Sequence, residues 1–418
     1  MDEVHVVTCV LRNRGEVLLL RRSDAVGSYA GRWGAVSGHA EGNPDAMARE
    51  EIAEETGLEA EVTRLRRGDP FEVVDAERGT RWVVHPSLFE ADSRAVEPNY
   101  ETDEYKWVHP TAMLRRETVP DLWASYDRVR PTVETVRGDR DHGSAWLSIR
   151  ALEGLRDEAG VRAWGEESGG WDEIAAVARD LRDARPSMPV VANRVNRVLA
   201  RADRSPEGVK EVAREEIEAV LVADDEAAET AAERLPDRIA TLSRSGTVRK
   251  AIERADPDAV LVAKSRPGGE GVGVAEELAE ERDVTLAGDA DLAWAIHEWE
   301  PKAVIVGADA IRPDGAVLNK VGTRAAALAA AHEEIAVLVA AAADKVRVDA
   351  KIEIESVDSG AIYDGPADLT VRSPLFDVTP PGLIDAICTD QGVLEPEDIE
   401  EVAAEHRANA EWANRLNS

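Results

Sequence analysis

The chain has 418 residues, enough for two or three domains with their own cores, and its 44% hydrophobic content is typical of a globular protein. Its 83 acidic residues outnumber the 50 basic ones, and the formal charge of -33 argues against direct binding to nucleic acid or to an anionic membrane. Lysine is scarce beside arginine, which together with the acidity predicts adaptation to a high-salt cytoplasm, where ions screen self-repulsion. An ordinary acidic protein is the alternative.

The two cysteines are too few for a disulfide framework. Cys9 lies in an apolar run that predicts a buried strand, and Cys388 lies in a stretch that we expect to be helical. Both are expected to be unreactive core thiols. The chain starts with no basic segment followed by an apolar stretch, and it has no apolar run of about 18 residues, so we expect a cytoplasmic protein.

The first predicted elements are two strands and a helix. The apolar runs 4–11 and 16–21 are joined by a short polar segment, which predicts a β-hairpin. Further on, Asn43 can cap a helix, Pro44 suits the first helical position, and Gly57 suits the residue after the last turn. We therefore predict a helix between these residues.

Three glutamates of that helix, Glu51, Glu54 and Glu55, are spaced so that they share one face. Like charges this close repel one another unless a cation lies between them, and carboxylate oxygens are the ligands that hard ions such as Mg²⁺ prefer. A solvated acidic face is the alternative, because the chain has other acidic helices.

A wider pattern surrounds the three glutamates. The segments LLLRR, GRWGAVSGH, EETGL and ETDEYKWVHP follow one another in this order. Together they resemble a Nudix hydrolase over residues 1–116. The resemblance implies that Glu51, Glu54 and Glu55 bind Mg²⁺ or Mn²⁺, with Glu54 as a catalytic residue, and that the metal bridges a diphosphate and activates water.

The sequence departs from this family's pattern at two points. Glu50 occupies the position of the family's arginine, with Arg49 one position early, and the connection from Gly38 to the helix is two residues short. We therefore expect slow hydrolysis. Glu101 or Glu104 is expected to add a carboxylate to the site.

The rest of the chain divides into three predicted parts. Residues 117–142 carry apolar side chains at helical spacing, which predicts a connecting helix. The pattern is helical throughout 143–238, which predicts a helical subdomain. In 239–418, short apolar runs alternate with helical patterns, so we expect a doubly wound, Rossmann-like parallel sheet. The predicted fold class is α/β, with an N-terminal α/β/α sandwich of the Nudix type ahead of these parts.

Polar residues follow the expected strands of the last part, at the edge of the sheet where ligands bind in such folds. Asp309 follows an apolar strand, and Asn319 and Lys320 are expected to open a helix. The candidate ligand-binding residues supply cations, hydrogen-bonding groups and the start of a helix. These residues are Arg185, Ser243, Arg244, Gly246, Arg266, Asp309, Asn319 and Lys320. For any single cation a surface ion pair is the alternative. As a set they predict a phosphorylated small molecule, a sugar phosphate or a nucleotide.

Six segments of this half, LSRSGTVRKAI, VAKSRPGGEG, VGADAI, NKVGT, LFDVTPPGLIDAI and TDQGV, resemble one family in order and spacing. That family unites the regulatory subunits of translation initiation factor 2B with ribose-1,5-bisphosphate isomerase and methylthioribose-1-phosphate isomerase. In the isomerases a cysteine and an aspartate carry the proton transfers, and these positions are Ser243 and Asp309 here. An arginine of a family phosphate segment is replaced by His142. Because a serine hydroxyl is far less acidic than a thiol, the resemblance implies a binding or regulatory member.

Three hypotheses about function follow from these resemblances. The first is an initiation factor 2B-like protein that binds a sugar phosphate or nucleotide, with a Nudix domain that hydrolyses or senses a nucleoside diphosphate derivative. The second is a bifunctional Nudix hydrolase and ribose-1,5-bisphosphate-type isomerase of nucleotide salvage. The third is a non-catalytic interaction protein with vestigial sites. The family also implies a homo-oligomer, at least a dimer, and the composition predicts a halophilic archaeal source.

Overall fold

The computed structural model describes residues 2–40, 42–165, 170–352, 354–356, 360 and 362–414. Its contacts divide the chain into two compact units. Unit 1 comprises Met1–Thr132 and Arg156–Gly170, and unit 2 comprises Val133–Leu155 and Trp171–Ser418. Each unit has its own hydrophobic cores. Within the described part of the chain, no helix has both the length and the apolar character needed to cross a membrane.

Unit 1 is built on an eight-stranded mixed sheet. Its strands are β1 (Asp2–Asn13), β2 (Glu16–Arg22), β3 (Trp33–Gly34), β4 (Val36–His39), β5 (Val62–Arg67), β6 (Phe71–Asp75), β7 (Thr80–Ala91) and β8 (Thr102–Val108). The long strands β1 and β7 pair in parallel, from Asp2 opposite Thr80 to Arg12 opposite Glu90. Strands β1 and β2 form the predicted hairpin, and β2 also pairs with β8.

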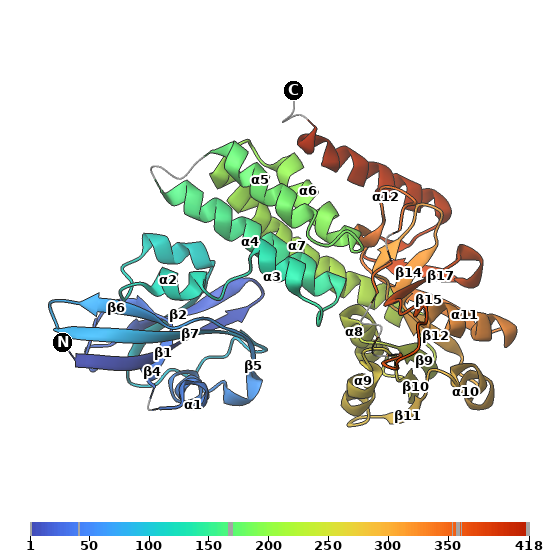
Figure 1. Cartoon of the computed structure of the whole chain (residues 1–418), viewed down its shortest axis with the longest axis horizontal. Coiled ribbons are helices and arrows are strands. Elements are labelled where there is room, and N and C mark those ends of the chain that lie inside the picture. The colour runs from blue at the N-terminus through green and yellow to red at the C-terminus, as the bar shows by residue number, and fades with distance from the viewer. Residues whose placement is uncertain are drawn as a thin grey trace. The chain divides into compact units, whose positions relative to one another are not determined.

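Helices cover both faces of this sheet (Figure 1). They are α1 (Pro44–Thr56) and α2 (Leu122–Asp127). Because side chains alternate along a strand, Cys9 of β1 packs with Ile52 of α1, whereas the adjacent Val10 packs with Leu122 of α2. Cys9 is therefore the buried strand thiol that the sequence predicts. The α/β/α sandwich predicted for this part of the chain is confirmed.

The predicted ends of α1 are confirmed. Asn43 accepts a hydrogen bond from the backbone N–H of Ala46, and Pro44 occupies the first turn. Gly57 has a left-handed conformation with φ of 73°, and its backbone N–H donates to the carbonyl of Ala53. The caps fix where the three glutamates of α1 lie relative to the sheet.

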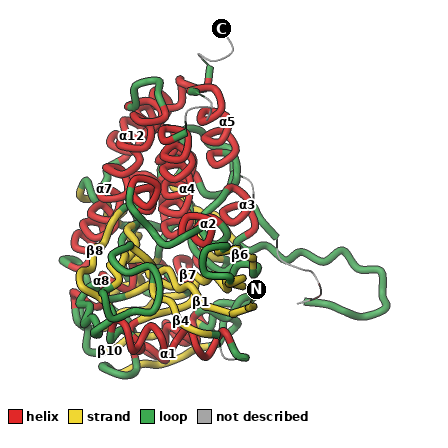
Figure 2. Tube along the Cα trace, turned by 90° about the vertical axis from the view of Figure 1, so that its left-hand side faces the viewer, coloured by secondary structure: helices red, strands yellow, loops and turns green. Residues whose placement is uncertain are grey.

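Helices form the first part of unit 2, together with a helix from the end of the chain. They are α3 (Val133–Gly138), the start of α4 (Ser144–Trp164), α5 (Trp171–Arg182), α6 (Pro189–Arg201), α7 (Pro206–Ala232) and α12 (Pro396–Asn409). Helix α6 packs against α5, α7 and α12, which lie together in both views (Figures 1 and 2). Where the sequence predicts one connecting helix over 117–142, the structure has α2 and α3, with Pro131 between them because proline disfavours a continuous helix.

The sheet of unit 2 has seven strands in the order β11-β10-β9-β12-β15-β17-β18, and all except β18 are parallel. The strands are β9 (Arg238–Leu242), β10 (Ala259–Ala263), β11 (Asp283–Ala287), β12 (Ala303–Val306), β15 (Ala336–Ala340), β17 (Ala386–Thr389) and β18 (Gly392–Val393). The helices beside them are α8 (Gly246–Ala255), α9 (Gly271–Leu278), α10 (Leu292–Trp299) and α11 (Thr323–His332). This is the predicted doubly wound sheet. Its strand order reverses between β9 and β12, so the carboxyl ends of these two strands are where such folds bind ligands.

Two local predictions in unit 2 are wrong. Asn319 and Lys320 end a strand, β14 (Val317–Lys320), and do not open a helix. Strand β14 pairs with β13 (Ala310–Ile311) and β16 (Phe376–Thr379) in a small antiparallel sheet, which satisfies its backbone groups. Cys388 lies in the parallel strand β17 and not in a helix, because its short apolar run is paired with β15.

Candidate functional sites

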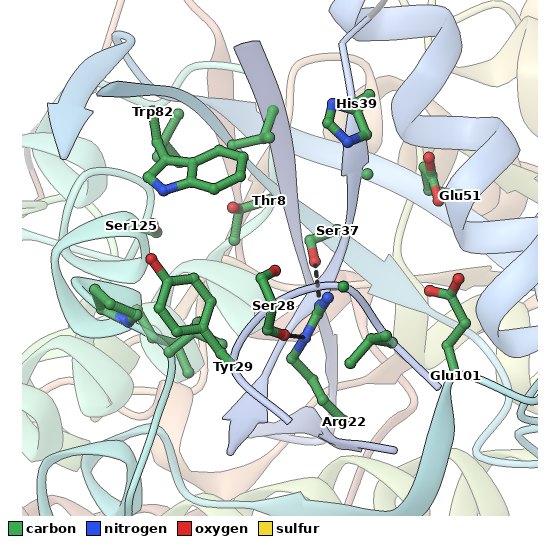
Figure 3. A pocket seen from close by; sticks show the side chains of 18 of the residues that line it. Thr8, Arg22, Ser28, Tyr29, Ser37, His39, Glu51, Trp82, Glu101 and Ser125 are labelled. Carbon is green, nitrogen blue, oxygen red and sulfur yellow. Dashed lines mark hydrogen bonds between the residues drawn. The ribbon is translucent and has the colours of Figure 1, made fainter. Parts of the chain in front are cut away.

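A pocket of unit 1 opens between the sheet and the elements around it. Its volume is about 850 Å³. Figure 3 shows two aromatic side chains, Tyr29 and Trp82, on one side of this pocket and two carboxylates, Glu51 and Glu101, on the other. Arg22 lies between them, so the pocket combines apolar, anionic and cationic walls.

Glu51 and Glu54 of α1 both line the pocket. The Glu51 carboxylate lies so close to Gly38 of β4 that any side chain there would collide with it. Burial, followed by repulsion from Glu54 and Glu101, raises the pKa of Glu51. Carboxylates of α1 and of the turn before β8 therefore lie close enough to repel one another.

Glu55 of α1 is buried and does not line the pocket, in contrast to the three-residue metal face expected from the sequence. It is buried, with 5% of its surface exposed, and it accepts a hydrogen bond of 2.9 Å from the backbone N–H of Ser37. Burial is the main reason why the pKa of Glu55 rises to about 8, and repulsion from Glu51 and Glu101 adds to it. The Ser37 amide and Arg22 act in the opposite direction.

Of Glu101 and Glu104, which were the two candidates for a further carboxylate, one lies at the pocket and the other does not. Glu101 lines the pocket, whereas Glu104 is outside it and pairs with Lys106 at 2.6 Å. Across the described residues, no three His, Cys, Asp or Glu side chains are already gathered closely enough to hold a metal ion. Oxygen donors that repel one another are nevertheless the chemistry that fits a hard divalent cation. Glu54 is exposed, so its side chain is free to rotate toward Glu51 and Glu101.

Arg22 is a pocket residue that sequence reasoning missed. Its Nε donates to the carbonyl of Ser28 at 2.9 Å and its guanidinium to the hydroxyl of Ser37 at 3.4 Å (Figure 3). The pairing of β2 with β8 is irregular between Arg21 and Arg22, and irregularities of this kind redirect side chains. Arg22 thus places a cation near Glu55, whereas Arg49 and Glu50 of α1 are both exposed.

The buried Glu55 leads to a testable pH dependence. In the unfolded chain it ionises near pH 4.5, whereas in the folded protein it keeps its proton up to about pH 8. Because the unfolded state loses this proton first, Glu55 destabilises the fold as the pH rises between these values, by roughly 3–5 kcal/mol at the upper end. Glu55→Gln should remove this loss and raise the Tm of unit 1 at pH 8.

The Tm of the parent and of Glu55→Gln is measured as a function of pH, in the presence of a chelator that removes divalent metal. A matched control is Glu72→Gln, since Glu72 is exposed on β6. The control should follow the parent. Equal pH slopes for the parent and Glu55→Gln would contradict the assignment.

A second pocket, of about 590 Å³, lies within unit 2. It includes the residues that follow β9 and β12, at the reversal of strand order. Of the eight sequence candidates, seven line it, and they are Arg185, Ser243, Arg244, Gly246, Asp309, Asn319 and Lys320. Arg266 does not line it: the side chain is exposed, and the loop is held by hydrogen bonds from the backbone N–H groups of Ser265 and Arg266 to Asp289.

Ser243 stands at the end of β9 with an uncommon backbone. Its φ is 62°, a left-handed conformation that costs energy for a residue other than glycine. The backbone N–H of Ser243 donates to the hydroxyl of Ser265 at 2.6 Å. Ser245 then caps α8 by accepting from the N–H of Val248, so the turn between strand and helix is sharply defined.

Asp309 and Lys345 both line this pocket and interact electrostatically. Burial raises the pKa of Asp309, while Lys345, the Ser144 hydroxyl and Arg185 act against that rise. Burial likewise lowers the pKa of Lys345, whose Nζ donates to the carbonyl of Ala308 at 2.6 Å. Both groups are thus shifted toward their neutral forms, as is common for groups that exchange protons.

The other cations of the pocket already have partners. Lys320 is buried and its Nζ donates to Glu270 at 2.6 Å. Arg185 donates to the carbonyl of Asp139 at 2.7 Å and lies 3.5 Å from the carboxylate of Glu355. Arg244 is exposed and donates to the carbonyl of Asp141 at 3.1 Å. Neither glutamate could be predicted as a partner, because each lies far along the chain from the cation that it contacts.

Comparisons with known proteins agree with these two units. Residues 140–396 match the model described as the initiation factor 2 subunit family, and residues 1–129 match the NUDIX domain model. Ribose 1,5-bisphosphate isomerase of Haloferax volcanii is 29% identical over 298 residues, covering 65% of this chain and 92% of that protein. Methylthioribose-1-phosphate isomerase of Pseudomonas fluorescens is 30% identical over 332 residues, covering 70% of this chain and 91% of that protein.

A solved structure is similar as well. The translation initiation factor eIF-2B of Pyrococcus horikoshii superposes with a TM-score of 0.56 and 28% identity, covering 64% of this chain and 97% of that one. Both resemblances found in the sequence are thus confirmed. The chain belongs to the initiation factor 2 subunit family and carries a NUDIX domain at its N-terminal end.

Proposed function

We propose that the protein has two independent sites. Unit 1 hydrolyses a nucleoside diphosphate-linked substrate with Mg²⁺ or Mn²⁺, and unit 2 binds a sugar phosphate or a nucleotide. The observation that carries the first part is the gathering of mutually repelling carboxylates beside Arg22 in one pocket. The second part rests on the pocket at the carboxyl ends of β9 and β12, which holds both cations and Asp309.

In unit 1, Glu51, Glu54 and Glu101 would hold the metal, which when bound neutralises phosphate charge and activates water. Glu55 would hold the Ser37 amide, and so the position of β4, in place. Arg22 is placed to receive a phosphate oxygen, since guanidinium groups bind phosphates well. The apolar wall of Tyr29 and Trp82 suits a flat ring on the same substrate.

In unit 2, Arg244 and the amides at the start of α8 would contact the phosphate of the ligand. Arg244 is exposed, and its guanidinium donates to the backbone carbonyl of Asp141, so it can turn toward an anion at little cost. Asn319 is held by its hydrogen bond to Thr323, and its placement suits a sugar hydroxyl.

Isomerisation of a sugar phosphate is a second candidate function of unit 2. The observation that favours it is Asp309, which lies beside Lys345 with a raised pKa. The two isomerases above are named for 1-phosphorylated sugars, which fits a pocket of this chemistry. Ser243 stands where those enzymes are expected to have a thiol, so a different group must then move the proton.

Binding in unit 2 can be tested with ribose 5-phosphate as the probe. Arg244→Gln should weaken binding about tenfold or more, because hydrogen bonds to charged groups contribute about 1.5–3 kcal/mol. Isothermal titration calorimetry on the full chain gives the Kd. Arg254→Gln is the matched control, since Arg254 lies on the same helix but outside the pocket and pairs with Asp225. Unchanged binding by Arg244→Gln, or none by the parent, would contradict the proposed site.

We also propose a homo-oligomer of at least two chains. Trp294 of α10 and Leu328 of α11 are exposed, at 64% and 53%, on helices that pack together. Large apolar side chains exposed on a surface favour contact with another chain. A light-scattering mass equal to one chain in high salt would refute this.

A further inference from the structure

One histidine that lines the pocket of unit 2 pairs with a carboxylate behind it in the sequence, and the proposed binding site uses neither group. Nδ1 of His142 lies 2.8 Å from Oδ2 of Asp139. The other carboxylate oxygen accepts the backbone N–H groups of Asp141 and His142, both at 2.9 Å. Burial alone would raise the pKa of Asp139, but these hydrogen bonds outweigh it and lower the pKa, so the carboxylate stays ionised. It therefore acts as a fixed acceptor for the imidazole.

The imidazole ring is also held by an aromatic neighbour. His142 stacks on Trp146 with 3.8 Å between ring centroids and 12° between planes. Because the ionised Asp139 can only accept, Nδ1 carries the proton and Nε2 of the neutral ring keeps its lone pair. Among the described residues, no hydrogen bond to Nε2 is found. The His142 ring is thus held in one orientation, and its Nε2 is available to a ligand.

The short loop that bears His142 is tied to the rest of the pocket. Arg185 binds the carbonyl of Asp139, and Arg244, the residue after Ser243, binds the carbonyl of Asp141. Ser144, two residues beyond His142, acts on Asp309. His142 itself lines the pocket together with Ser243 and Asp309. The loop is therefore anchored beside both positions at which the isomerases carry their acid and base.

We propose that His142 is a catalytic acid–base group of the unit 2 pocket, that it takes over the proton transfer for which Ser243 is unsuited, and that Asp139 is its positioning residue. This rests on the proposed binding of a sugar phosphate in the same pocket, and it makes the pocket an isomerase site.

The step balances for a furanose that carries a phosphate on C1. Protonated Asp309 gives its proton to the ring oxygen as the bond from that oxygen to C1 breaks. Nε2 of His142 takes the proton from C2, and the electron pair of that C–H bond forms the C1=C2 double bond of an enol. The C2 hydroxyl then returns a proton to Asp309, C2 becomes a carbonyl, and the imidazolium gives its proton to C1. Both side chains end as they began.

The experiment uses the full chain with ribose 1,5-bisphosphate and methylthioribose 1-phosphate as probes. The parent should convert at least one of them to its ketose. His142→Gln should lower kcat about 10²- to 10⁴-fold, the usual contribution of a positioned acid or base. The Kd for the unreactive ribose 5-phosphate should change by less than about threefold, below 1 kcal/mol. His142→Phe keeps a ring to stack on Trp146 and should be equally inactive.

Two further variants separate catalysis from a structural role. Asp139→Asn should lower kcat and shift the ¹⁵N resonances of His142 away from the Nδ1–H tautomer, a change that a purely structural role would not produce. His332→Gln replaces an exposed histidine near the end of α11, outside the pocket, and should match the parent.

The possible outcomes distinguish catalysis by His142 from the binding of a sugar phosphate by unit 2. If the parent binds ribose 5-phosphate but converts neither probe, His142 is not a catalytic group, while the binding function stands. If His142→Gln turns over at the parent's rate, the proposal is likewise overturned. If the parent binds no sugar phosphate at all, the proposed function of unit 2 fails first, and this proposal with it.

Discussion

Replacing Glu51 by glutamine is expected to lower the Mg²⁺-dependent hydrolysis of nucleoside diphosphate sugars about 100-fold or more. A bound metal stabilises transition-state charge by several kcal/mol, and each 1.36 kcal/mol corresponds to a factor of about ten. Glu51 is the carboxylate that lies against β4 and feels the repulsion of Glu54 and Glu101, so the loss of its charge weakens the whole cluster. The measurements are kcat/KM with ADP-ribose as the probe and the Mg²⁺ affinity by calorimetry.

Glu72→Gln serves again as the matched control, because this exposed glutamate of β6 lies outside the pocket. It should retain the parent's rate and metal affinity. Glutamine nearly preserves the shape of Glu51, so both variants should fold. Hydrolysis by Glu51→Gln at the parent's rate would show that the metal is held elsewhere.

Replacing Arg194 by methionine is expected to destabilise unit 2 by about 3–5 kcal/mol, the usual cost of removing one partner from a buried ion pair. This arginine is fully buried and forms hydrogen bonds to Asp344 at 2.8 Å and to Asp224 at 3.1 Å. Its third contact is the hydroxyl of Ser148 at 2.7 Å. Arg197 remains beside Asp344, but Asp224 would lose its buried cation.

The loss corresponds to roughly 10 °C in the Tm of unit 2. Arg194→Lys keeps the charge but not the three-way geometry, so it should fall between the parent and Arg194→Met. Arg249→Met is the surface control: its pair with Glu253 is exposed on both sides, and such pairs contribute about 0–1 kcal/mol. Equal losses for Arg194→Met and Arg249→Met would mean that the buried network does not stabilise the fold.

The sequence could predict those features that depend on local chemistry. Asn43 and Gly57 bound α1 as expected, because caps act on the adjacent backbone. The apolar runs of unit 2 predict its parallel strands correctly, because strands that are buried on both faces are apolar throughout. Asp309 could be placed at the ligand edge because it comes shortly after such a strand, β12.

Features that depend on contacts distant in the sequence could not be predicted. Lys320 follows an apolar run like a residue that opens a helix, yet pairing of β14 with β16 holds it in a strand. The orientation of Arg22 depends on an irregularity in the pairing of β2 with β8, and no local pattern encodes it. The pairing of His142 with Asp139 is close in sequence, but only the fold shows that it faces the same pocket as Asp309.

The central claim is that one chain holds two independent sites, and the most direct test measures both functions in both single variants. We predict that Glu51→Gln loses hydrolysis of the nucleoside diphosphate probe but binds ribose 5-phosphate with the parent's Kd. Arg244→Gln should show the reverse. Loss of both functions in either folded variant, or a parent that hydrolyses no nucleoside diphosphate derivative with Mg²⁺ or Mn²⁺, would contradict the account.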